Sequence, residues 1–186
     1  KKGLYAWLIR NLREWDQVSA DRPDKYIANS ETVARRLKKY YRMDSTVVFP
    51  PVDVKSFRVN EGHSDYFLIV STLTPYKRID LAVQLFNKIG RRLVIIGDGP
   101  HRSYLEAIAA DNIDFLGFKS DEEVREYMQN CRAFLFPGED DFGITPVEAM
   151  ACGKPVLAFG RGGALETVVA GRTGEFFYEP TVESME

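Results

Sequence analysis

Apolar and polar positions along this chain follow two different periods. In residues 1–22 the apolar side chains recur at positions 4, 5, 8, 12 and 15 with basic residues between them, a spacing typical of an amphipathic helix. From residue 66 onward, short continuous apolar runs alternate with helical patterns. Continuous apolar runs are typical of parallel strands that are buried on both faces. The pattern therefore predicts an α/β fold, a doubly wound parallel sheet (Rossmann-like) with helices on both faces.

The predicted elements form two groups, separated by a polar, turn-like stretch at residues 58–65. We place the domain boundary there, with one part at residues 1–60 and the sheet domain at residues 61–186. The first part is expected to hold helices within 1–22 and at 31–41, and strands at 26–28 and 46–49. The sheet domain is expected to hold strands at 66–73, 92–96, 113–118, 132–136, 155–159 and 175–178, and helices at 79–89, 101–110, 121–130, from Thr145, and at 164–170.

The stretch from Phe134 to Phe159 has the most residues suited to chemistry. A buried strand is followed by three acids at residues 139–141, then by a helix for which Thr145 is the predicted N-cap and Pro146 the first helical residue. In open α/β sheets, ligands bind beyond the carboxyl ends of the strands, and helix N-termini attract anions. Glu148, expected in the first turn, can reach the same ligand. The alternative interpretation is a helix-capping loop with solvated acids.

Composition describes an ordinary globular chain and argues against several classes of function. Its 186 residues are 45% apolar and carry a net charge of -2, which does not favour binding to nucleic acid. No apolar run approaches the roughly 20 residues of a membrane span. Cys131 and Cys152 lack metal-site spacing, so we expect buried thiols and a reducing, cytoplasmic compartment. His63 and His101, both expected in surface loops, leave little from which to build a metal site.

The turn after the first strand of the sheet domain favours phosphate over a dinucleotide. Residues 72–78 contain no glycine, whereas a nicotinamide or flavin enzyme of this fold has a glycine-rich turn there. The turn at residues 97–100 (GDGP) is glycine-rich but lacks the Lys-Ser/Thr ending of a P-loop. Lys77 offers a cation at a strand's carboxyl end and a helix start, which suits a phosphate oxygen. An oxidoreductase is therefore disfavoured.

Four motifs occur together in an order that resembles a known family. They are residues 71–81 (STLTPYKRIDL), 97–100 (GDGP), 115–118 (FLGF) and 137–158. In this order they resemble the carboxy-terminal, donor-nucleotide domain of family 4 glycosyltransferases, which have a GT-B architecture. Upstream, the chain looks like the last βα unit of the preceding domain and the entry to the linker, so most of that domain would be missing. The resemblance covers nearly the whole chain. It implies a retaining transfer from a nucleotide-sugar, with nucleotide diphosphate as the leaving group. We expect no cofactor and no metal to be required, because the helix N-terminus and Lys77 already suit a diphosphate.

The resemblance also assigns roles to individual residues. The family has two glutamates with seven residues between them; here Glu148 fills the second position and Asp140 the first. Glu148 would hold the ribose hydroxyls, Asp140 the transferred sugar and Lys77 the diphosphate, which makes these three the catalytic candidates. Asp140 is one methylene shorter than the family's glutamate, which puts its reach in question. Sugar contacts are expected from the backbone at residues Phe142, Gly143 and Ile144, and the donor-binding set also includes Gly97 and Thr145.

One expected cation is absent from the diphosphate site. The family has an arginine five residues before the lysine, where this chain has Thr72. Two phosphates that face one lysine leave excess charge in a partly dry cleft. We therefore expect Arg161, in the glycine-rich loop 160–163, to supply the second cation. The alternative is that Arg161 is a solvent-facing loop residue.

The nucleobase is expected near residues 117–121. Phe118 and Lys119 belong to the predicted base site, and in guanine-using relatives an acid near the position of Asp121 accepts the N–H groups of the base. A local explanation competes for Asp121. Ser120 and Glu123 have the spacing of a capping box, and Asp121 would then only occupy its first turn.

The preferred function is transfer of a hexose, with GDP-mannose as donor, because residues 74–81 look most like mannosyltransferases of polysaccharide assembly. A UDP-sugar donor and a non-catalytic nucleotide-binding module are the alternatives. The expected acceptor is a glycan or a lipid-linked glycan. Basic residues at 35–42 allow peripheral membrane association, although they are more often a solvated face. The three acids at 139–141 also allow a Mg²⁺ or Mn²⁺ site as an alternative.

Overall fold

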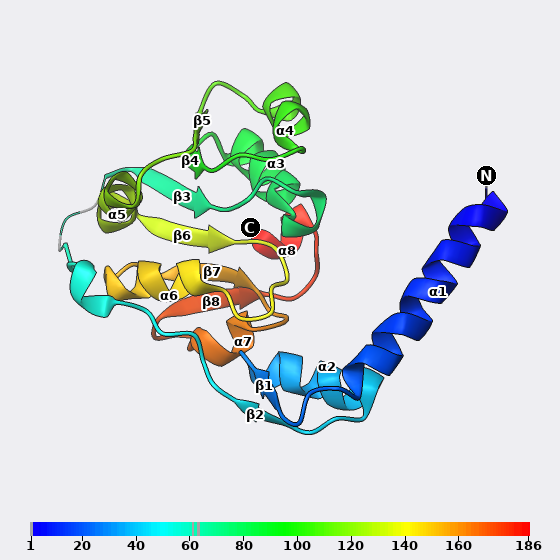
Figure 1. The fold of residues 1–186 in the computed structure, drawn as a ribbon. Coiled ribbons are helices and arrows are strands. Elements are labelled where there is room, and N and C mark those ends of the chain that lie inside the picture. Colours follow the sequence, from blue (N-terminus) through cyan, green and yellow to red (C-terminus); the bar gives the residue numbers. More distant parts are fainter. Residues whose placement is uncertain (1, 61, 63) are drawn as a thin grey trace. The chain divides into compact units, whose positions relative to one another are not determined.

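The computed structural model describes residues 2–60, 62 and 64–186, and it forms two compact units, Lys1–Phe49 and Pro50–Glu186 (Figure 1). The structure therefore divides the chain before the predicted boundary at residues 60 and 61. Residues 50–60 belong to the second unit, because Phe57 packs against the core of that unit and the Asn60 side-chain amide donates a hydrogen bond to Asn130 Oδ1 at 2.9 Å. His63, predicted to lie in a surface loop, falls outside the described residues.

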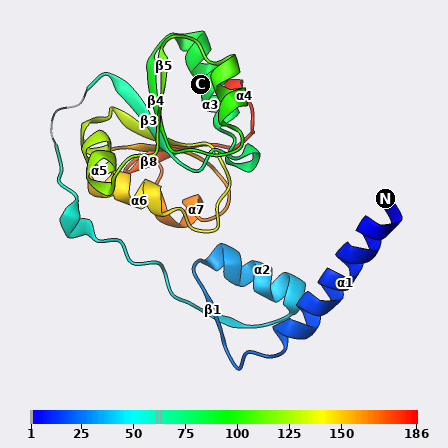
Figure 2. The ribbon, with the colours of Figure 1, turned by 45° about the horizontal axis from the view of Figure 1, so that its top comes forward.

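The first unit is a small βαβ arrangement preceded by a long helix (Figure 2). Its two strands pair in parallel. Ser30 caps the second helix, because its side chain accepts a hydrogen bond from the Val33 N–H at 3.1 Å. The elements are α1 (Lys2–Ala20), β1 (Tyr26–Ala28), α2 (Glu31–Tyr41) and β2 (Ser45–Val47), so the predicted types are confirmed and the second strand ends earlier than expected.

The second unit is a six-stranded, all-parallel sheet in the order β5-β4-β3-β6-β7-β8. Helices connect successive strands, as expected for a doubly wound fold. The strands are β3 (Tyr66–Val70), β4 (Arg92–Ile96), β5 (Ile113–Gly117), β6 (Ala133–Phe136), β7 (Val156–Phe159) and β8 (Gly174–Phe177). The helices are α3 (Ile79–Ile89), α4 (Arg102–Ile108), α5 (Asp121–Asn130), α6 (Ile144–Ala151), α7 (Ala164–Thr167) and α8 (Val182–Met185), with 3-10 turns η1 (Val54–Ser56) and η2 (Pro75–Lys77).

Helices cover both faces of the sheet, which confirms the predicted layering (Figure 1). Helices α3, α4 and α8 pack in one core cluster, and α5, α6 and α7 pack in the other. Successive strand residues point to opposite faces, so Leu68 belongs to the second cluster and its neighbour Ile69 to the first. Burial of both faces is the reason why the strands read as continuous apolar runs.

The elements differ from the prediction mainly at their ends. The strand expected at residues 66–73 ends at Val70, and the chain beyond it runs along the β4–α4 turn, where the Leu73 N–H bonds to Asp98 O at 2.9 Å. This approach is close, since a Cβ at Gly97 would lie 1.9 Å from Ser71 O. The helices expected at 101–110 and 164–170 are shorter, and α8 was not expected.

The strand order creates a switch point between β3 and β6. Strands β4 and β5 follow on one side of this pair, and β7 and β8 on the other. The loops that leave the carboxyl ends of β3 and β6 diverge at such a point, and the crevice between them is the usual ligand site of open α/β sheets. Residues 71–78 and 137–143 form these two loops.

Candidate functional site

A cavity of about 430 Å³ lies at the carboxyl ends of β3, β4 and β5, closed on one side by α5 and α6. It brings together residues that are far apart in the sequence. Those that the sequence had singled out are Thr72, Gly97, Phe118, Lys119, Asp121, Thr145 and Glu148. Asp98 and Val124 also line it and were missed, although Asp98 lies within the glycine-rich turn that the sequence analysis had noted. The larger part of the predicted site is therefore one contiguous surface.

Glu148 is the carboxylate with the most perturbed environment in this cavity. Burial raises its pKa, the negative charge of Asp121 raises it further, and Arg125 partly opposes both. Ionised Glu148 is therefore short of favourable partners in the protein itself. Groups that donate hydrogen bonds to a carboxylate, such as vicinal hydroxyls, would supply them.

The start of α6 corrects the prediction for Thr145 and Glu148. The N-cap is Gly143, so the helix begins at Ile144 and Thr145 is its second residue. Gly143 has φ 84°, a conformation that glycine adopts without strain, and Pro146 is tolerated because early helical N–H groups have no partner within the helix. Glu148 lies beyond the first turn, which holds no acid. The helix dipole therefore helps Glu148 less than predicted, in keeping with its raised pKa.

Phe118 presents an exposed aromatic ring on the cavity wall. Its side chain is 87% exposed although it is large and apolar. Lys119, also in the wall, donates a hydrogen bond to Glu123 Oε1 at 2.8 Å, and Glu123 is held at a pKa of about 2 by this lysine and by Ser120. A flat apolar face beside polar groups is a suitable surface for stacking a ring.

Both interpretations of Asp121 are compatible with the structure. The capping box is present, because Glu123 N–H donates to Ser120 Oγ at 3.3 Å and Ser120 N–H donates to Glu123 Oε2 at 3.0 Å. Asp121 lies in the first turn of α5 and at the same time lines the cavity. The capping box therefore accounts for the helix start without occupying the carboxylate of Asp121.

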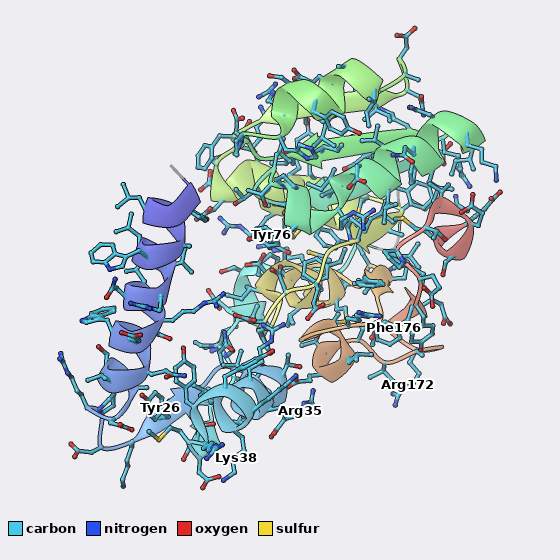
Figure 3. All side chains as sticks on the ribbon, turned by 90° about the vertical axis from the view of Figure 1, so that its right-hand side faces the viewer. Tyr26, Arg35, Lys38, Tyr76, Arg172 and Phe176 are labelled. Atoms are coloured by element: carbon cyan, nitrogen blue, oxygen red, sulfur yellow. The ribbon has the colours of Figure 1, made fainter. Side chains whose placement is uncertain are left out.

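Lys77 and Asp140 are brought together by the loops that follow β3 and β6. The Lys77 ammonium donates to both carboxylate oxygens, at 2.6 Å to Oδ1, and the two side chains are only 16% and 21% exposed. The ammonium also lies 5.2 Å from the ring centroid of Tyr76, which is labelled in Figure 3. Neither Lys77 nor Asp140 lines the 430 Å³ cavity. Two of the three catalytic candidates thus form an ion pair at the switch point.

Three of the predicted sugar contacts lie at the start of α6. Phe142 is buried, Gly143 caps the helix and Ile144 is its first, exposed residue. None of the three lines the cavity, whereas Thr145, the next residue, does. Their predicted hydrogen bonds through the backbone stay a prediction.

Arg161 lies in a loop that packs against the Asp140 loop. The Gly163 N–H donates to Asp140 O at 2.8 Å, while the Arg161 guanidinium lies 5.5 Å from the ring centroid of Phe159. Arg161 is exposed and does not line the cavity. The structure therefore brings its loop to the candidate site, and its role towards phosphate stays a prediction.

The cysteines are buried, as predicted, while the compartment in which they are reduced stays a prediction. Burial raises the pKa of Cys131 to about 12 and that of Cys152 to about 11. His101 lies in the turn before α4, as its N-cap, and is partly exposed there, with its ring stacked on Tyr104 at 4.6 Å between centroids.

Residues 2–60, 62 and 64–186 hold neither a cluster of metal-ligating side chains nor a membrane-spanning helix. Among them, no group of three or more His, Cys, Asp or Glu residues is arranged to hold a metal ion. A helix with the length and apolarity needed to cross a membrane is also not found in that part of the chain.

Comparison with known proteins identifies the family. Residues 53–186 match the model of the family described as glycosyl transferases group 1. The chain belongs to this family. An uncharacterised glycosyltransferase of Methanocaldococcus jannaschii is 32% identical over 180 residues, which is 92% of this chain and 51% of the relative. The chain therefore spans about half the length of this relative.

Two further similarities are with a mannosyltransferase and with a solved structure. An alpha-1,3/1,6-mannosyltransferase of Dictyostelium discoideum is 42% identical over 74 residues, 39% of this chain and 17% of that protein. The crystal structure of Anabaena HepE in complex with UDP-glucose superposes with a TM-score of 0.78 at 21% identity, over 89% of this chain and 53% of that one. The structural likeness shows that the fold is that of GT-B glycosyltransferases.

Proposed function

We propose that this chain is the donor-binding part of a glycosyltransferase that transfers a hexose from a nucleotide-sugar to a glycan or lipid-linked acceptor with retention. The observation that carries the proposal is the cavity at the carboxyl ends of β3, β4 and β5, where Phe118, Asp121 and Glu148 line one wall. These side chains offer a ring to stack on and two carboxylates, which are the groups that a nucleoside requires.

The residues have separate roles in this proposal. The base stacks on Phe118, and Lys119 and Asp121 meet its edge. The ribose hydroxyls donate to Glu148, whose charge Arg125 offsets only in part, and Thr72, Gly97 and Thr145 line the cavity beside it. The diphosphate extends towards Lys77, the N-terminus of α6 and Arg161. The sugar reaches Asp140 and the backbone at residues 142–144.

Catalysis in this proposal is electrostatic. As the bond between sugar and phosphate breaks, negative charge grows on the departing diphosphate, and fixed cations and N–H donors stabilise it. Lys77 is one such cation, because its ion pair with Asp140 lies in a partly dry environment. No metal is required in this account, and activity that persists in a chelator would support that part of it.

GDP-mannose is the donor that we favour. Guanine offers two neighbouring N–H groups to a single carboxylate, as Asp121 can accept, whereas uracil offers one. The partial similarity to a mannosyltransferase supports the choice. The structural neighbour with UDP-glucose keeps a UDP-sugar as the alternative. The acceptor would bind to a preceding domain, and the whole enzyme would work in the cytoplasm, with peripheral attachment to the membrane.

A thermal-shift series tests the nucleotide-binding step. A ligand that binds only the folded state raises the midpoint of unfolding, and the rise grows with the ratio of free ligand concentration to Kd. We expect GDP and GDP-mannose at saturating concentration to raise Tm by several degrees, UDP to raise it less, and Asp121→Ala to remove the difference between GDP and UDP. No shift with GDP, UDP, ADP or their sugar conjugates would contradict the proposal.

A further inference from the structure

Lys77 and Asp140 form an ion pair with each other, although the proposed function assigns Lys77 to the diphosphate of the donor and Asp140 to its sugar. The ammonium bonds to both oxygens of the carboxylate, at 2.6 Å to Oδ1, and the two side chains are largely shielded from water. Each charge is thus neutralised by the other, at the switch point between β3 and β6. A diphosphate that binds Lys77 needs the same donors that Asp140 now uses.

The backbone that carries Asp140 is fixed from both sides. A Cβ at Gly138 would lie 2.7 Å from the Lys77 Cα, and a Cβ at Gly162 would lie 2.3 Å from Asp140 O. The Asp140 carbonyl also accepts a hydrogen bond from Gly163 N–H at 2.8 Å. Main-chain contacts this close hold the loop in place, so the Asp140 carboxylate would move by a change of side-chain rotamer and not by a shift of its backbone.

We infer that Asp140 is the resident counter-ion of Lys77, that the donor diphosphate takes its place, and that this exchange releases the carboxylate towards the sugar. The inference rests on the proposed function and adds an order of events to it. Lys77 remains neutralised throughout, first by Asp140 and then by phosphate, so a shielded cation is never left without a partner. The sugar contact forms only once the diphosphate is bound.

The alternative hypothesis is that the Lys77–Asp140 ion pair is structural and stays intact when the donor binds. In that case Asp140 orients Lys77 for the phosphate, and loss of the carboxylate weakens binding. In our inference the carboxylate competes with phosphate, so its loss strengthens binding. The sign of the change in affinity separates the two, and a merely structural role cannot produce the increase.

Titration calorimetry with inorganic pyrophosphate, GDP and GMP is the test, on the whole chain, and the thermal-shift series reports on UDP. Asp140→Asn keeps the size of the side chain and removes its charge. We expect this variant to bind pyrophosphate and GDP about three- to tenfold more tightly than the wild type, as for release of one ion pair. GMP, which lacks the second phosphate, should bind equally to both. Lys77→Gln should lose most of the affinity for pyrophosphate.

Asp114→Asn is the matched control for net charge. Asp114 pairs with Arg92 at 2.9 Å on the surface and does not line the cavity, so its removal should leave all three affinities unchanged. Unfolding midpoints of all variants verify that they are folded. An Asp140→Asn variant that is folded and binds pyrophosphate equally or more weakly overturns the inference and leaves the proposed function standing. If the wild type binds neither pyrophosphate nor GDP or UDP, the proposed function fails and the inference fails with it.

Discussion

At the scale of single residues, ionised Glu148 lowers the stability of the folded protein, and the same carboxylate is proposed to bind the ribose hydroxyls of the donor. Burial and the neighbouring charge of Asp121 raise its pKa, so the folded protein favours the neutral form. A carboxylate of this kind lowers stability wherever it is ionised. Ligand hydroxyls would recover part of that cost, which is a common compromise at binding sites.

The substitution Glu148→Gln tests this compromise through its dependence on pH. The pKa of Glu148 is higher in the folded than in the unfolded chain, so the ionised side chain destabilises the wild type above the folded pKa and has no such effect below the unfolded value. We expect Glu148→Gln to raise Tm by a few degrees at pH 7 and to lose this advantage as the pH falls through the raised pKa. Thermal unfolding across that range measures it. A constant difference, or a lower Tm at pH 7, would contradict the assignment of the cost to ionisation.

At the scale of elements, the two loops at the switch point depend on close main-chain contact. Gly138, two residues after the end of β6, packs on the backbone of Lys77 in η2, where a Cβ on Gly138 would come within 2.7 Å of Lys77 Cα and 2.8 Å of Lys77 O. The contacted atoms of Lys77 belong to the main chain, so they cannot move away as the end of a flexible side chain could. The ion pair between Lys77 and Asp140 exists because this contact brings the loops together.

Gly138→Ala should therefore separate the loops. Overpacking of this kind costs about 1–3 kcal/mol, and here it should also weaken pyrophosphate binding, since Lys77 and the Asp140 loop shift apart. Gly90→Ala is the matched control, because nothing lies within 4 Å of its Cβ position and its cost, about 1 kcal/mol, comes only from φ 67°. Urea unfolding and calorimetry measure the two effects. Equal losses of stability in the two variants, with pyrophosphate affinity intact, would show that the contact is not needed.

Sequence patterns predicted the type and order of most elements but not their ends. The strand predicted at residues 66–73 is longer than β3, which ends at Val70, where the continuous apolar run also ends. Beyond Val70 the chain bonds to the β4–α4 turn, and a contact of this kind cannot be seen in the apolar pattern. The start of α6 was displaced for a similar reason. Thr145 and Pro146 are good capping signals, yet the N-cap is Gly143, so the helix starts two residues earlier than predicted.

At the scale of the whole molecule, the strand order explains which predicted residues meet. Parallel strands direct their carboxyl ends to one edge, so residues 72, 97, 118 and 148, which follow different strands, line one cavity. The sequence could identify these because each follows an apolar run or a motif. The pairing of Lys77 with Asp140 could not be predicted, since it depends on the packing of two loops that the sequence separates by 63 positions.

We propose above all that this cavity binds the nucleotide of a sugar donor. Substitution of Phe118 tests this proposal without much effect on the fold, because the residue is 87% exposed. Calorimetric titration with GDP-mannose, or with UDP-glucose if GDP-mannose does not bind, compares the wild type with Phe118→Ala and with Tyr40→Ala, an exposed aromatic of the other unit. We expect one site per chain, a loss of about 1–3 kcal/mol in binding free energy for Phe118→Ala, as for one stacked base, and no change for Tyr40→Ala. Failure of both donors to bind, or equal affinity of the wild type and Phe118→Ala, would contradict it.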